Sequence, residues 1–159
     1  MKAYILKILL KETNIWRRIS IPSGYSFHDL HEAIQIVFGW ECYHLHEFNA
    51  AGILIAADEN DDIDMMPDKF RYESDVSLDL ILLNVKSFNY VYDFGDWWEH
   101  TIKVEKVIDD FTDVPQLIDY GGTMVVEDCH DGKTLMEEAK DMKVDRIEIN
   151  AILEETFGG

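Results

Sequence analysis

The chain has 159 residues, 47% of them hydrophobic, and a formal net charge of -18 from 32 acidic and 14 basic side chains. A surface that binds duplex DNA needs several Lys or Arg side chains on phosphates, so this composition argues against direct nucleic-acid binding. No run of about 18 apolar residues is present, which excludes a membrane-spanning helix, and the start of the chain lacks a signal-peptide cleavage site, so we expect a cytoplasmic protein.

The first third of the chain predicts strands around one helix. Residues 2–10 and 15–21 are β-rich and partly alternating, which is typical of paired strands. An amphipathic helix follows, with Ser26 as its N-cap, Asp29 completing a capping box and Gly39 ending it. Two short strands are predicted in the sequences HLHEFNA and ILIA, on either side of a turn at residues 51–52.

The remainder predicts an acidic loop, one long hairpin and three helical segments. The hairpin joins FNYVYDF to WWEHTIKVEKVI through a two-residue turn at Gly95 and Asp96. The other expected segments are an acidic loop at 58–69, a short helix at 77–83, a loop after Pro115, a capped helix at 135–142 and a last helix near 149–157. Together they predict a single α+β domain over residues 1–159, with an antiparallel, roll-like sheet flanked by helices.

The hairpin holds the candidate catalytic pair. A two-residue turn pairs Tyr92 with Glu99 and Val91 with His100, which places Asp93 and His100 on one face as diagonal neighbours. A carboxylate beside an imidazole is the arrangement of a general base or of a metal ligand with its supporting partner. The alternative interpretation is architectural, because no nucleophile is tied to the pair: a buried histidine satisfied by a nearby carboxylate.

The YHLHEF stretch holds the candidate metal ligands. His44 and His46 alternate, so on a strand both rings lie on one face, a spacing suited to a divalent metal as cofactor. Further ligands are sought among His100, Asp128 and Cys129, with Asp96, Glu127, His28 and His31 as additional donors. Alternating histidines at a strand edge are the structural alternative, because no HExxH or CxxC motif accompanies them.

Several blocks of this sequence, taken together, resemble the plasmid pRiA4b ORF-3-like family. They are WRRI, LHEAIQIVFGW, HLHEF, YVYDFGDWWEH and VVEDC, and they span the chain from about Ile15 to the final helix. The resemblance implies an α+β roll-like domain found on plasmids and mobile elements as well as on chromosomes, and it implies no catalytic mechanism. Val125-Val126 and 130–132 depart from the Pro-Pro and Gly-Gly that family members commonly carry around Glu127, Asp128 and Cys129.

Two functions follow as hypotheses. The first is a non-enzymatic binding or adaptor module that holds a protein partner through exposed aromatics and an acidic surface. Its candidate binding residues are Tyr92, Asp96, Trp97, Trp98, Glu127, Asp128 and Cys129. The alternative is a metal-assisted hydrolase of the phosphoester type, with a cleft of His, Asp and Cys side chains. Resolvase activity is a third, weaker hypothesis, since neither a basic surface nor a positioned nucleophile is visible.

Overall fold

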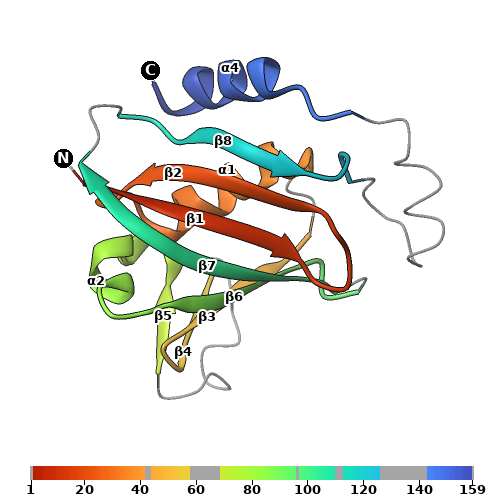
Figure 1. Cartoon of the computed structure of the whole chain (residues 1–159). Helices are drawn as coiled ribbons and strands as arrows, with labels where there is room; N and C mark the ends of the chain where they lie inside the picture. The colour runs from red at the N-terminus through yellow and green to blue at the C-terminus, as the bar shows by residue number, and fades with distance from the viewer. Residues whose placement is uncertain are drawn as a thin grey trace.

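The computed structural model describes residues 2–41, 44–57, 69–95, 97–109, 113–125 and 143–158. These residues form one eight-stranded sheet in the order β5-β4-β3-β6-β7-β1-β2-β8 (Figure 1). Every neighbouring pair is antiparallel except β4 and β5, which are parallel. The strands are β1 (Lys2–Leu10), β2 (Trp16–Pro22), β3 (His46–Ala50), β4 (Ile53–Ala56), β5 (Phe70–Tyr72), β6 (Ser87–Tyr92), β7 (Trp98–Asp109) and β8 (Gln116–Gly121). The α+β class expected from the sequence is confirmed.

The helices accompany this strongly curved sheet. They are α1 (Phe27–Phe38), the 3-10 turn η2 (Glu73–Asp75), α2 (Leu78–Leu82) and α4 (Arg146–Phe157). Side chains of α1 pack into one continuous core with the inward face of the sheet, whereas α4 lies along β8 at the sheet edge (Figure 1). None of the helices in these ranges is long and apolar enough to cross a bilayer.

The predicted start and end of α1 are confirmed. The Ser26 hydroxyl accepts a hydrogen bond from the Asp29 main-chain N–H, and the Asp29 carboxylate accepts one from the Ser26 N–H. Gly39 follows the helix with φ 81°, the left-handed conformation that glycine adopts without steric cost. The paired strands at the N-terminus, the β3–β4 hairpin, the short α2 and the last helix also lie where the sequence predicts them.

The segment after Pro115, predicted to be a loop, is strand β8. Its pattern is poorly alternating and four of its six residues are exposed, so the sequence carries little strand signal. Pairing with β2 and cover from α4 create the strand, and both are long-range contacts. Residues 58–68 of the acidic loop predicted at 58–69 lie outside the described residues, as does the predicted helix at 135–142.

The predicted hairpin register is wrong. Tyr92 pairs with Trp98, and Tyr90 pairs with His100, so the connection spans the five residues 93–97. This register places Tyr90, Tyr92 and His100 together on the core face, where each is 0% exposed. Burial of these rings therefore decides the register, and the two-residue turn that made Asp93 and His100 neighbours does not form.

Arg17 places a charged side chain inside the core. Arg17 of β2 is 0% exposed, and its guanidinium donates hydrogen bonds to main-chain oxygens of Val37, Trp16, Gly121 and Thr123. These acceptors belong to the end of α1, to β2 itself and to the segment at and after the end of β8. Arg17 thus ties three elements together.

Candidate functional site

The structure separates three histidines that the sequence grouped, His44, His46 and His100. The His44 Nε2 atom lies 3.5 Å from the Asp93 carboxylate, and the His46 Nε2 atom lies 2.6 Å from Glu73. His100 is in the core with its Nδ1 atom 3.1 Å from the Tyr90 carbonyl oxygen. Asp96, Glu127, Asp128 and Cys129 lie outside the described residues.

Glu73 is the centre of a carboxylate–histidine cluster that joins three elements. This carboxylate, 2% exposed on η2, accepts a hydrogen bond from His46 of β3 and lies 2.9 Å from the Nδ1 atom of His28 on α1. The Nε2 atom of His28 lies 3.0 Å from Glu32, one turn further along α1. A half-exposed imidazole is thereby connected to a buried one through a single carboxylate.

His31 extends this cluster toward the middle of the sheet. Its ring is stacked on that of His46, with centroids 3.4 Å apart and planes 4° apart. Its Nδ1 atom lies 2.7 Å from the Tyr90 hydroxyl, which also accepts a hydrogen bond from the Gln35 side-chain amide. A hydroxyl has one proton and two acceptor sites, so the Tyr90 hydroxyl holds the Gln35 amide and the His31 ring at the same time.

The environment divides these groups into charged and neutral ones. Burial, together with the nearby His46 and His28, lowers the pKa of His31 to about 2, so this ring is neutral. Burial alone would lower the pKa of His28 and raise that of Glu73. Their mutual hydrogen bonds and charges reverse both effects, with His46 and Glu32 contributing, so the pKa of His28 is raised and that of Glu73 is lowered.

The cluster can hold a buried negative charge and exchange protons with solvent through His28. Among the residues described here, no group of three or more His, Cys, Asp or Glu side chains is arranged to hold a metal ion. His46, a predicted ligand, instead has its Nε2 atom engaged by Glu73. Glu73 was not predicted as a site residue, because it stands alone in the sequence YESD with no motif around it.

His100 lies in an aromatic cluster with Trp40 and Trp98. Burial lowers the pKa of His100 to about 4, partly offset by hydrogen bonds with main-chain groups of Tyr90 and Trp98. In the described part of the chain, only three buried side-chain nitrogen atoms have no hydrogen-bond partner, and they are His100 Nε2, Trp40 Nε1 and Trp98 Nε1. His100, predicted as a catalytic or metal-binding residue, is therefore a neutral core residue.

A second candidate site lies on the opposite face of the same strands. Glu47, Val91 and Glu99 form one row across β3, β6 and β7, because Val91 pairs with both glutamates. With Asn49, Asn89 and Trp97 they line a hollow of about 190 Å³. Burial raises the pKa of Glu47, and Glu99 accepts a salt bridge of 3.1 Å from Lys11. We call these six residues the Trp97 hollow.

Trp97 stands at the rim of this hollow in an unusual conformation. The residue is 52% exposed, and its neighbour in the loop, Phe94, is 41% exposed with its ring 6.0 Å away. The backbone φ angles of Asp93 and Trp97 are 64° and 58°, in the left-handed region that non-glycine residues rarely occupy. Residues with such backbone angles cluster at active sites and ligand-binding sites. The predicted binding residue Trp97 therefore remains a candidate.

The comparisons with known proteins match most of the chain. The family model for plasmid pRiA4b ORF-3-like protein matches residues 2–156. The uncharacterized protein y4hQ of Sinorhizobium fredii is 34% identical over 128 residues, which cover 77% of this chain and 64% of that protein's length. A crystal structure of MM3350, a protein of unknown function from Methanosarcina mazei Go1, has a TM-score of 0.72 and 31% identity, covering 98% of this chain and 88% of the other.

Proposed function

This chain belongs to the plasmid pRiA4b ORF-3-like family, and we propose that it is a binding module that takes up a basic side chain of a protein partner in the Trp97 hollow. The observation that carries the proposal is the composition of the hollow. Two carboxylates, two amides and one exposed indole converge on a single small depression on the face of the sheet opposite the core.

Each of these groups recognises a cation. Carboxylates form charge-assisted hydrogen bonds with Lys or Arg, amide oxygens accept further hydrogen bonds, and an indole face attracts the positive charge. The chain's own Lys11 forms an ion pair with Glu99, so an ammonium group already fits beside this hollow. The net charge of -18 adds long-range attraction for a basic partner.

Short lysine-rich and arginine-rich peptides test the proposal by isothermal titration calorimetry, with a glutamate-rich peptide as the negative probe. We expect Trp97→Ala and Glu47→Gln each to weaken binding of the basic peptides by about tenfold, the loss expected for one cation–π contact or one partly desolvated charge pair. Lys11→Met is expected to strengthen binding, because it removes the internal competitor for Glu99.

The matched control is Asp109→Asn, which removes the same single charge from an exposed position at the far end of β7. If Asp109→Asn weakens peptide binding as much as Glu47→Gln does, and Trp97→Ala has no effect, the attraction is only that of the net charge. That result would reject the Trp97 hollow as the binding site.

The metal-assisted hydrolase is the alternative proposal. One predicted ligand, His44, lies beside one predicted catalytic residue, Asp93, at the base of the hairpin loop. Elemental analysis of the purified protein for Zn, Mn and Fe tests it: stoichiometric metal that is lost in His44→Ala would favour the hydrolase over the binding module.

A further inference from the structure

Strand β8 forms one edge of the sheet, and side chains of α4 take up its outward main-chain groups. The Leu117 N–H donates to the Asn150 side-chain oxygen at 2.7 Å, and the Asn150 amide nitrogen donates to the Leu117 carbonyl at 3.2 Å. Arg146, in the first turn of α4, donates to the Ile118 carbonyl at 2.9 Å. The outward main-chain groups of Leu117 and Ile118 are thus paired without a ninth strand.

The Asn150 contact imitates strand pairing. In an antiparallel ladder, residues of a hydrogen-bonded pair exchange both N–H to carbonyl bonds. The carboxamide of Asn150 makes the same two bonds with Leu117, from a helix and not from a strand. Uncovered edges are templates for pairing with another chain, and covering the edge with a helix is one way in which proteins prevent it.

The hold of α4 on the rest of the molecule is modest. Of its twelve residues only Ile149 and Leu153 are buried, although Phe157 packs against Tyr25 with ring centroids 5.7 Å apart. Ile147 is 83% exposed and Ile152 is 40% exposed. An element with few buried apolar contacts opens at a lower free energy than the sheet does, so the cover is separable from the fold.

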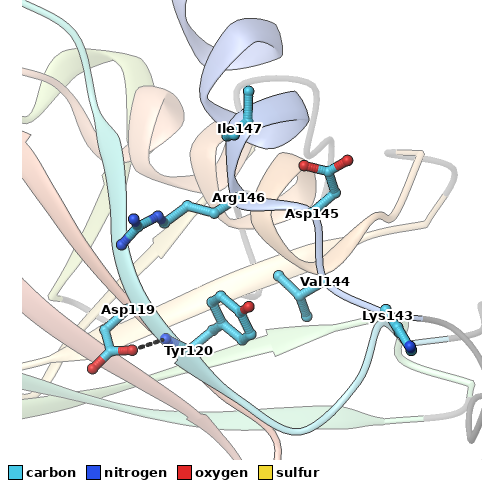
Figure 2. Close-up of a pocket in the computed structure, with 7 residues that line it drawn as sticks. All are labelled: Asp119, Tyr120, Lys143, Val144, Asp145, Arg146 and Ile147. Carbon is cyan, nitrogen blue, oxygen red and sulfur yellow. Dashed lines mark hydrogen bonds between the residues drawn. The ribbon is translucent and has the colours of Figure 1, made fainter.

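The surface beside α4 also differs in charge from the molecule as a whole. A groove of about 770 Å³ runs between the end of β8 and the start of α4, and Figure 2 shows Arg146 extending from the helix toward β8. The groove is lined by Asp119, Tyr120, Lys143, Val144, Asp145, Arg146 and Ile147. Two positive and two negative side chains give this groove a net charge of about zero. The net charge of -18 makes other parts of the surface repel a second copy of the chain.

We propose that the β8 edge is a pairing surface for β8 of a second copy of this chain, and that α4 keeps it closed through Asn150 and Arg146. Antiparallel pairing of two identical edges is self-complementary about a two-fold axis and closes as a dimer. Ile118 and Tyr120, each 38% exposed on β8, supply apolar side chains for that contact. This pairing is independent of the Trp97 hollow, which lies on other strands.

Size-exclusion chromatography with light scattering tests the proposal. We expect the Arg146→Met/Asn150→Ala double variant to shift from monomer to dimer, and the added substitution Ile118→Lys to restore the monomer, because a charge on an edge strand opposes pairing. The matched control is Lys103→Met/Asn89→Ala, which removes the same kinds of group from the central strands β6 and β7 and should stay monomeric.

A folded double variant that keeps the wild-type mass overturns the proposal, as does a dimer that Ile118→Lys does not dissociate. If the double variant does not fold, hydrogen exchange on the wild-type chain decides. The Leu117 amide should exchange with a smaller opening free energy than the amides of β1. If the Leu117 amide exchanges only when the whole protein unfolds, then α4 does not open by itself. That result would overturn the proposal.

Discussion

Replacing Arg17 with methionine is expected to lower the free energy of unfolding by about 4 kcal/mol, because four main-chain carbonyl groups lose their donor at once, each at a cost of about 1 kcal/mol or more when buried. The affected oxygens belong to Trp16, Val37, Gly121 and Thr123, at distances of 2.7–3.2 Å from the guanidinium. Methionine fills much of the same volume, so the loss reports the hydrogen bonds more than a cavity.

The charge of Arg17 is compatible with this buried position. Burial lowers the pKa of Arg17 to about 10, so the side chain remains charged at neutral pH. Val37 lies in the last turn of α1, where carbonyl groups point out of the helix and carry its negative partial charge. The Phe38 ring lies 5.0 Å from the guanidinium carbon and adds a cation–π contact.

Arg18→Met is the matched control, since the adjacent arginine makes its ion pairs with Glu105 and Asp119 at the partly exposed surface. Its replacement should cost less than about 1 kcal/mol, as is typical of exposed ion pairs. Urea denaturation of the two variants measures the difference. Equal losses for Arg17→Met and Arg18→Met would mean that the buried hydrogen bonds contribute no more than a surface pair.

Local sequence signals predicted most of the fold. The capping box of Ser26 and Asp29, the left-handed Gly39 and the period of 3.6 residues between them are local, and α1 begins and ends where they indicate. The hairpin register depends instead on which side of β7 faces the core, and burial of His100 beside Tyr90 decides it. Strand β8 likewise forms because it pairs with β2, and no residue near it in the sequence indicates that pairing.

The candidate sites were predicted only in part. The sequence predicted Trp97 as a candidate because aromatic residues concentrate in its loop, and His46 because it alternates with His44. The carboxylate that actually engages His46 comes from Glu73, 27 residues away, through a 3-10 turn that the sequence did not predict. Contacts of that kind depend on the order of strands in the sheet, so spacing along the chain cannot reveal them.

The protein is expected to lose stability steeply on acidification, because its two most buried histidines are neutral. The folded-state pKa is about 4 for His100 and about 2 for His31, mainly through burial. Between pH 6.5 and 4 the unfolded chain binds a proton at each position that the folded chain excludes. Each histidine therefore lowers the free energy of unfolding by about 1.4 kcal/mol per pH unit, or by about 3 kcal/mol over the whole interval.

Glu73 and His28 also contribute to the pH dependence of the free energy of unfolding. Glu73 has a lowered pKa, so its contribution is present above its ordinary pKa and is lost as the pH falls through the folded-state value, which adds to acid unfolding. His28 has a raised pKa, so its contribution is complete below pH 6.5 and is lost as the pH rises, which opposes the trend only above that interval. Acidification below pH 6.5 therefore remains destabilising.

The variant His100→Gln tests the origin of this dependence, because glutamine can still donate to the Tyr90 carbonyl but does not titrate. Urea denaturation at pH 7, 6, 5 and 4.5 should give a combined slope of about 2.7 kcal/mol per pH unit for the wild type below pH 6 and about half of that for the variant. His31, which stays in both proteins, supplies the remaining slope. Identical slopes would mean that His100 binds its proton in the folded chain as readily as in water, and that its burial has no electrostatic consequence.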